Sequence, residues 1–177
     1  MATSSSTNFE PNVTEFIEEA YERCGLELRT GYDLKTAIRS VNLMLAEWAN
    51  RGLNQWTIDQ STQTVTQGTT EYALNANVID ILDVVVRRTV NSTQTDISMS
   101  RVGRSEYLNI PNKETQARPT QYFFDKSVVP VLNVWPAPEN STDILVFNKI
   151  IRMDDADEPT NTMDMPFRFY PCFVAGL

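Results

Sequence analysis

The sequence contains no histidine, and this absence limits the chemistry that the protein can perform. Histidine is the usual general base near neutral pH and a very common metal ligand. Without it, Ser–His–Asp catalysis, Cys–His catalysis and histidine-containing zinc sites are excluded. We therefore expect a protein that is not an enzyme and that holds neither a cofactor nor a metal ion.

Cysteine is nearly as scarce, since only Cys24 and Cys172 are present and they lie far apart. They form no C-x-x-C pair, so neither a redox motif nor a disulfide framework is indicated, and both are expected to pack inside the protein. The first eight residues lack the basic and apolar regions of a signal peptide. No apolar run approaches the roughly 18 residues of a membrane span. We expect no membrane contact and synthesis in a reducing cytoplasm.

Basic residues are outnumbered by acidic ones, 15 to 23, which gives a net charge of −8. This balance argues against tight binding to DNA, because such binding depends on Lys and Arg displacing counterions from phosphates. Residues 61–120 differ from the rest, with six acids and six bases. Arginine is enriched at interfaces, but exposed arginines also pair with a chain's own acids. Both roles stay open for the candidate interface residues Arg87, Arg88, Arg101 and Arg104.

Apart from a flexible arm over residues 1–11, the first third of the chain has helical periodicity. Apolar residues recur at helical spacing over residues 13–24 and again over 32–50. Gly25 and Gly52 follow these stretches, where glycine commonly ends a helix. The short link between the two stretches predicts an antiparallel helical hairpin over residues 12–54.

Residues 55–160 have the composition of a β-rich insertion. Short strands are predicted near residues 56–59, 63–66, 71–74, 79–89, 95–99, 121–124, 131–135 and 143–152, with a short helix over 104–109. Gly68 and the Asn91-Ser92 pair indicate turns, and residues 136–140 are predicted to connect two strands of a hairpin. We expect this insertion to form an antiparallel platform.

Residues 161–177 become apolar and aromatic again, which predicts the start of a returning C-terminal helix. The fold class is therefore α+β, with a helical hairpin, a large β-rich insertion and a returning helix. Trp56 is equally compatible with packing in the core and with a position in a subunit interface. The aromatic candidates for an interface are Trp56, Phe167, Phe169, Tyr170 and Phe173.

Three other interpretations of side chains are weaker. Asp154, Asp155, Asp157 and Glu158 form an acidic run without the glycine turn and distal glutamate of a calcium loop, so a solvated loop is favoured. Glycoside hydrolysis requires two carboxylates at a fixed separation, and nothing in the sequence fixes the separation of Glu71, Asp80 and Asp83. As an alternative function, the β-rich part could be a carbohydrate- or protein-binding module that uses Trp56 or Tyr72.

The order and spacing of several phrases resemble the head–tail adaptors of short-tailed phages, also called head-to-tail connectors or tail tubular protein A. The resemblance covers roughly residues 12–177. The matching phrases are LMLAEWANRGL at 43–53, VTQGTTEYAL at 65–74, VIDILDVVVR at 78–87, SEYLNIPNK at 105–113, RPTQYFFD at 118–125, VWPAP at 134–138 and MP at 165–166.

The resemblance implies a structural virion protein at the head–tail junction, assembled in the host cytoplasm. Such adaptors form a homo-oligomeric ring, usually of twelve subunits, between the portal protein and the tail nozzle protein. Double-stranded DNA passes through the lumen without sequence-specific binding, and the ring helps to retain it. The helical part would line the ring, and the β-rich part would form an outer platform that can also meet tail fibres.

Overall fold

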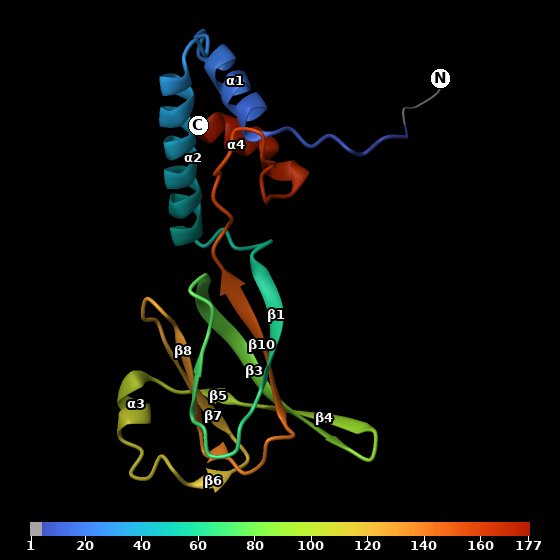
Figure 1. Ribbon diagram of the computed structural model, residues 1–177, viewed down its shortest axis with the longest axis vertical. Coiled ribbons are helices and arrows are strands. Elements are labelled where there is room, and N and C mark those ends of the chain that lie inside the picture. The colour runs from blue at the N-terminus through green and yellow to red at the C-terminus, as the bar shows by residue number, and fades with distance from the viewer. Residues whose placement is uncertain (1–4) are drawn as a thin grey trace. The chain divides into compact units, whose positions relative to one another are not determined.

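The structure is a computed structural model that describes residues 5–177. The first four residues of the predicted arm lie outside the described residues. The chain forms two compact units. The helical unit consists of the chain up to Trp56 together with Met153–Leu177, and the β unit consists of Thr57–Arg152. Figure 1 labels the elements of both.

The helical unit begins with two helices whose starts are set by local sequence. Helix α1 (Val13–Arg23) has a reciprocal cap, in which the Glu15 amide donates to Asn12 Oδ1 at 2.9 Å and the Asn12 amide donates to Glu15 Oε2 at 2.8 Å. Helix α2 (Gly31–Asn50) is capped in the same way by Thr30 and Asp33. Each cap satisfies amide groups that lack a partner within the helix.

The returning C-terminal segment completes the core of this unit. It consists of the 3₁₀ helix η1 (Phe167–Phe169) and helix α4 (Tyr170–Gly176). Phe173 of α4 is fully buried, with ring centroids 5.1 Å from Phe16 and 6.2 Å from Trp48. Truncating a buried phenylalanine costs about 3–5 kcal/mol, so this ring contributes strongly to the joining of the three helices. The buried residues of this core are Val13, Phe16, Ile17, Ala20, Ala37, Val41, Leu45, Met153, Ala156, Met163, Met165, Phe173 and Val174.

Residues 153–160, which the sequence places in the β-rich insertion, contribute to the helical core. Met153 and Ala156 are buried there. Asn42 on α2 holds this segment, because its side chain accepts a hydrogen bond from the Ala156 amide at 2.8 Å and donates to the Ala156 carbonyl at 3.2 Å. The Val13 amide donates to the Asn161 carbonyl at 2.9 Å. The backbone of the segment is therefore held against the helical unit, while its side chains Asp154, Asp155, Asp157 and Glu158 are exposed, as predicted for a solvated loop.

Both cysteines are exposed, so the prediction that they pack inside the protein is wrong. Cys24 is the C-cap residue of α1, one turn beyond the last buried residue Ala20. Cys172 lies on α4 just before the two residues of that helix that face the core, Phe173 and Val174.

The β unit contains two four-stranded sheets and one two-stranded sheet. Sheet order is β1-β10-β3-β4 in the first, β2-β8-β7-β5 in the second, and β6-β9 in the third. The strands are β1 (Ile58–Thr64), β2 (Glu71–Ala73), β3 (Val78–Val90), β4 (Thr93–Ser98), β5 (Ser100–Arg101), β6 (Gln116–Ala117), β7 (Gln121–Asp125), β8 (Val131–Trp135), β9 (Ala137–Pro138) and β10 (Ile144–Ile151), and α3 (Arg104–Leu108) is the one short helix of this unit.

The structure confirms a mixed α+β fold with antiparallel sheets, and it corrects three details. The pairs β5–β7 and β6–β9 are parallel. The strands predicted at 56–59 and 63–66 are one strand, β1. Residues 136–140 do not connect a hairpin, because β8 and β10 belong to different sheets. This segment crosses from one sheet to the other and contains β9 on the way.

One core joins the two larger sheets of the β unit. Strand β3 contributes Ile81, Val84 and Val86 to it, and a register shift in the pairing of β3 with β10 falls between the first two. Leu132 and Val134 from β8, with Leu145 and Phe147 from β10, fill the same cluster. The predicted turn at Asn91-Ser92 joins β3 to β4, and both residues have positive φ angles, 48° and 63°. Such a two-residue turn matches the natural twist of a hairpin.

The β unit is expected to fold without the helical unit, because its two chain ends are hydrogen-bonded to each other. The Ile151 amide donates to the Thr57 carbonyl at 2.8 Å, next to the paired residues Ile58 and Ile150. A fragment of residues 57–152 should show cooperative thermal unfolding and dispersed amide resonances in NMR spectra.

A shorter fragment, residues 66–152, is the matched control. It lacks β1, so β10 loses one of its two neighbouring strands. We expect a clearly lower melting temperature than for residues 57–152. An unfolded 57–152 fragment would contradict the independence of the β unit.

Candidate functional site

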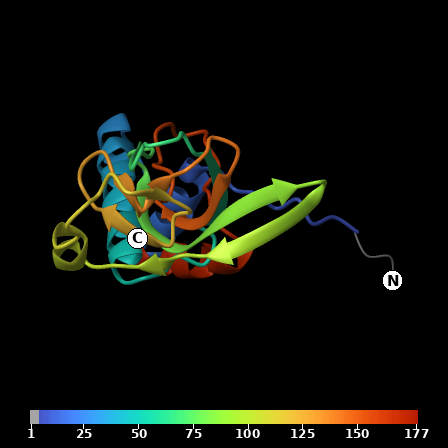
Figure 2. The ribbon, with the colours of Figure 1, turned by 90° about the horizontal axis from the view of Figure 1, so that it is seen from below.

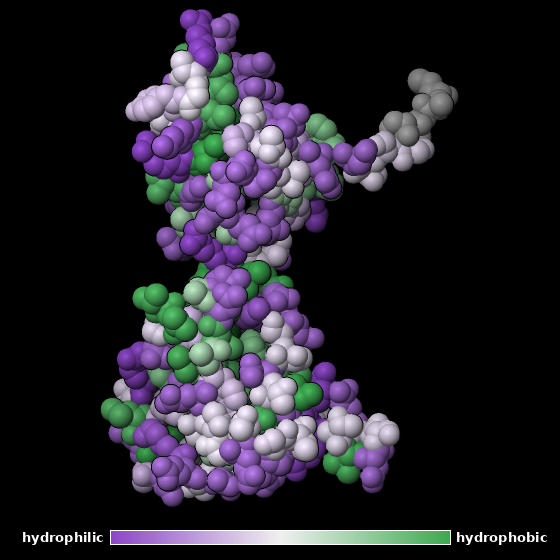
Figure 3. All heavy atoms as spheres, in the orientation of Figure 1, coloured by the Kyte–Doolittle hydropathy of each residue, from purple (hydrophilic) through white to green (hydrophobic). Residues whose placement is uncertain are grey.

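The charge of the chain is concentrated in the helical unit. Residues 1–56 and 153–177 contain 13 acidic and six basic residues, a net charge of −7. Residues 57–152 contain ten acidic and nine basic residues, a net charge of −1. In Figure 3 the visible face of the helical unit is largely covered by hydrophilic residues. The helical unit is therefore the part of the chain that repels anions.

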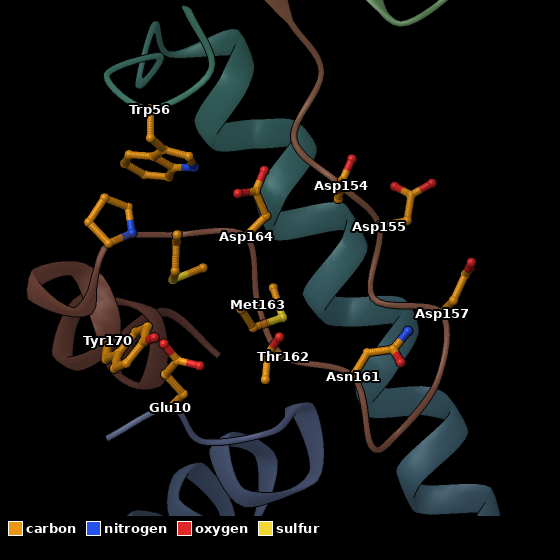
Figure 4. Close-up of a pocket in the computed structure, with 12 residues that line it drawn as sticks. Glu10, Trp56, Asp154, Asp155, Asp157, Asn161, Thr162, Met163, Asp164 and Tyr170 are labelled. Atoms are coloured by element: carbon orange, nitrogen blue, oxygen red, sulfur yellow. The ribbon is translucent and has the colours of Figure 1, made fainter. Parts of the chain in front are cut away.

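An open pocket of about 860 Å³ lies in this unit, between the end of α2 and the segment that leads to α4. Its carboxylates come from the N-terminal arm and from the residues after β10, and Figure 4 shows them around the opening. Trp56 and Tyr170 form aromatic parts of its wall. The acidic lining residues are Glu10, Asp154, Asp155, Asp157 and Asp164.

Trp56 lies at the edge of this pocket and contacts the returning segment. Its ring centroid is 4.5 Å from that of Phe169, and the residue packs against the helical core. The buried Nε1–H of Trp56 has no hydrogen-bond partner among residues 5–177. A buried donor without an acceptor costs about 1–3 kcal/mol. Trp56 therefore has an apolar face used for packing and a polar edge that is unsatisfied within the subunit.

The other aromatic candidates differ in how much of each side chain reaches solvent. Phe167 is 71% exposed, whereas Phe169 and Tyr170 are partly buried. Tyr170 packs edge-on against Phe16 at 4.9 Å. Phe173 is fully buried, so its ring supports this surface from inside and is not itself presented to a partner. Phe167 is the candidate that is most available for contact.

Asp164 is the pocket carboxylate with an altered acidity. Although the residue is exposed as a whole, the surrounding protein partly desolvates its carboxyl group, and this raises its pKa. The negative charge of Asp154 raises the pKa further. The proximity of Asp154 thus disfavours the ionised form of Asp164. The acidic run predicted at 154–158 marks one wall, but sequence did not indicate that Glu10 and Asp164 join it.

No three acidic or cysteine side chains among residues 5–177 are placed to hold a metal ion. Asp154, Asp155, Asp157 and Glu158 are all exposed. The calcium interpretation therefore has no support in the geometry of these carboxylates.

The four candidate arginines lie in the β unit, and each is paired with an acid of the same unit. Arg87 makes two hydrogen bonds to Asp96, at 2.8 and 2.7 Å. Arg101 donates to Asp80 at 2.9 Å, and Arg104 pairs with Asp125. An acidic partner would have to compete with these pairs. The arginines and the aromatic candidates belong to different units, so the structure does not bring them together in one site.

Arg88 makes the most buried of these pairs. It donates to both oxygens of Asp143, with an Nη2–Oδ2 distance of 2.7 Å, and to Glu139 at 2.8 Å. The Asp143 side chain is 3% exposed, and Asn140 donates to it at 3.2 Å. These hydrogen bonds, that from Arg88 above all, lower the pKa of Asp143. The pair ties β3 to the residue that precedes β10.

Two of the candidates for catalysis or sugar binding, Asp80 and Tyr72, are held in other contacts. Burial acts to raise the pKa of Asp80, but hydrogen bonds from Lys126, the Ile81 amide and Arg101 outweigh it and lower the pKa. Asp80 is therefore held ionised, which does not suit a general acid. Tyr72 is 7% exposed, and its hydroxyl donates to the Thr69 carbonyl at 3.0 Å. It packs in the β core instead of offering a platform.

One surface group had no signal in the sequence. Tyr107 of α3 stacks on Phe123 of β7, with centroids 5.5 Å apart. Arg104 lies 5.7 Å from the centre of the Phe123 ring, and Lys113 lies 5.6 Å from that of Tyr107. Because the two rings are separated by 15 residues and meet only through tertiary packing, no local pattern reveals them. The group fixes α3 on the sheet through cation–π and stacking contacts.

A model of the SU10 adaptor protein family matches residues 11–177, a range that includes nearly all of the helical unit and the whole β unit. None of the curated proteins compared with the chain matches it. Within residues 5–177, no helix combines the length and the apolarity needed to cross a membrane.

The Arg88–Asp143 pair yields a stability prediction. Asp143→Asn removes the buried ionised partner of Arg88 and leaves only the more exposed Glu139, which should lower the free energy of unfolding of the β unit by about 3 kcal/mol. Asp125→Asn, which disrupts the exposed pair with Arg104, should cost less than about 1 kcal/mol. Urea unfolding of both variants in the 57–152 fragment measures the difference.

The same pair predicts a pH dependence. The folded-state pKa of Asp143 lies below the ordinary value of 3.8, so its contribution is complete above about pH 5 and is lost as the pH falls through the folded pKa. The gap in unfolding free energy between wild type and Asp143→Asn should therefore narrow below about pH 4. A gap that stays constant from pH 7 to pH 3 would rule out an ionic origin.

Proposed function

The chain belongs to the SU10 adaptor protein family and is thus a structural adaptor of a phage virion, and we propose that it forms the ring between portal and tail. In this proposal twelve subunits assemble at the head–tail junction of a short-tailed phage. The ring binds the portal protein on one side and the tail nozzle protein on the other. It conducts the packaged double-stranded DNA and helps to retain it.

The family match is the observation on which this proposal rests. It extends over 11–177, so it includes both units and the segments that connect them. The proposed ring therefore involves both units of the chain.

The distribution of charge supports a channel that does not trap DNA. The resemblance to head–tail adaptors implies that the helical unit lines the ring, and this unit has a net charge of −7. Twelve copies would present a strongly negative wall to the phosphates. Attractive contacts, which depend on Lys and Arg, would slow the passage of DNA. A negative wall would let the duplex slide.

Self-association is supported by the surface around the returning segment. Phe167 is 71% exposed, and the Trp56 Nε1–H lacks an acceptor within the subunit. Aromatic residues are enriched in subunit interfaces, where a neighbour covers their apolar faces and accepts their polar hydrogens. We assign this surface to contacts with other virion proteins, including neighbouring copies.

The β unit is assigned to the outside of the ring. It is close to neutral, and its surface is rich in Thr, Gln and Asn, which suits hydrated contacts between proteins. The tail nozzle and tail fibres are the partners proposed for it.

Electron microscopy of the purified chain, alone and mixed with the portal protein of the same phage, tests the ring. Class averages should show closed rings, with twelve-fold symmetry, stacked on the portal. Native mass spectrometry gives the subunit number. Particles that remain monomeric even with portal present would overturn the proposal.

The exposed aromatic yields a second prediction. Phe167→Ser should reduce the fraction of chain in rings or portal complexes by about tenfold, the effect of losing roughly 1.4 kcal/mol of interface energy. Tyr32→Ser is the matched control, because Tyr32 is a similarly exposed aromatic (77%) of the same unit. Size-exclusion chromatography with light scattering measures both variants. If the two variants assemble equally well, Phe167 is not an interface residue.

A further inference from the structure

The first sheet of the β unit ends on both sides in a long strand without a neighbour. In the order β1-β10-β3-β4, the outer strands are β1 with seven residues and β4 with six. Nearly all residues of both strands are exposed or half-exposed. An outer strand of this kind offers a row of unpaired amide and carbonyl groups to another chain.

Soluble proteins usually protect such edges, and the second sheet of this unit does so. Its outer strands, β2 and β5, have only three and two residues. Neither β1 nor β4 contains the lysine, proline or bulge that commonly blocks pairing. Both edges contain the same uncharged tetrapeptide, Ser-Thr-Gln-Thr, at 61–64 and at 92–95.

The charges on the two edges are already neutralised inside the subunit. Asp59 is the one charged residue of β1, and it pairs with Lys149 of β10 at 3.3 Å. Asp96 is the one charged residue of β4, and it pairs with Arg87 of β3 at 2.7 Å. Two such strands can therefore approach each other without bringing unpaired like charges together.

The register shows which amides are available. The Ile151 amide bonds to Thr57 and the Val65 amide to Asp143, so odd-numbered residues of β1 bond to β10. The amides of Gln60 and Thr62 then point away from the sheet, because bonding alternates along an antiparallel strand.

The same reasoning applies to the other edge. The Met99 amide donates to the Val84 carbonyl, and the pairing register continues unchanged to the pair Val90–Thr93 at the turn, so odd-numbered residues of β4 bond to β3. The amides of Gln94 and Asp96 therefore point outward from β4. The end of this hairpin extends beyond the rest of its sheet, since pairing of β3 with β10 stops at Arg87. Figure 2 shows the β3–β4 hairpin projecting from the β unit.

We propose that β4 of one subunit adds to the free edge of β1 of the next, so that the first sheets of neighbouring subunits join into one continuous sheet. The occupant of each edge is thus a second copy of this chain. This inference rests on the proposed ring and names the contact that builds it. Because the two edges differ, the contact is head-to-tail, and a head-to-tail contact with a suitable rotation closes into a ring.

Proline at an outward-pointing position tests the contact without breaking the subunit's own ladder. Thr62→Pro removes an outward-pointing amide hydrogen of β1, and Gln94→Pro removes one of β4. The subunit itself should stay folded, because edge strands tolerate proline where the amide points away from the sheet. Each variant should lower the assembled fraction by about tenfold or more. Thr62→Ala and Gln94→Ala keep the amide and should assemble like wild type. Circular dichroism melts confirm that each variant is folded.

Mixing the two proline variants tests the head-to-tail arrangement. The Thr62→Pro chain retains an intact β4 edge, and the Gln94→Pro chain retains an intact β1 edge. The mixture should form heterodimers in native mass spectrometry and no larger species. Absence of heterodimers, when each variant alone is folded and monomeric, would overturn the proposed pairing.

Hydrogen exchange on unmodified protein gives an independent measurement. The amides of Gln60, Thr62, Gln94 and Asp96 should exchange rapidly in dilute monomer and become at least about tenfold slower in the assembled state. Rings that form while these amides still exchange rapidly, or while both proline variants assemble normally, would refute the strand contact and leave the proposed function intact. Wild-type chain that never self-associates, with or without portal, would refute both.

Discussion

The pairing of β1 with β10 is the constraint on which the rest of the structure depends. It brings together the two points at which the chain enters and leaves the β unit, Thr57 and Ile151. It also places β10 in the middle of the first sheet, where Leu145 and Phe147 fill the core shared with the second sheet. Because the insertion closes on itself in this way, the helical unit can be formed from two segments that are almost a hundred residues apart in sequence.

Charge is used differently in the two units. In the β unit, arginines and acids cancel in specific pairs, of which Arg88 with Asp143 is the most buried. In the helical unit, acids outnumber bases, and the Asp154–Asp164 side of the pocket brings carboxylates close enough to raise one pKa. Paired charges fix strands to one another, whereas unpaired charges of one sign repel a polyanion. This difference is consistent with the proposed ring, in which the helical unit would face DNA and the β unit would contact proteins.

Local signals in the sequence were sufficient for the helices and for the tight turn. Asn12 with Glu15 determines where α1 begins, and Asn91-Ser92 adopts the turn that its side chains favour. Long-range choices were not predictable. Residues 136–140 resemble a hairpin loop, but the strands on either side of it pair in different sheets. Trp56 contacts Phe169, which lies 113 positions later in the sequence. Met153 is buried although the acidic residues that follow it indicate a solvated loop. Each outcome depends on packing between distant segments, about which a local pattern contains no information.

The division of the helical unit into two segments also sets an order of events during translation. A chain leaves the ribosome from its N-terminus, so α1 and α2 emerge first, with the apolar faces of Phe16 and Val41 unsatisfied. The whole β unit is synthesised next, and it has every strand that it needs to fold. Only when Phe173 arrives can the three helices close on one another. The helical core thus stays incomplete while the whole β unit is synthesised, a period in which chaperones would have a surface to bind.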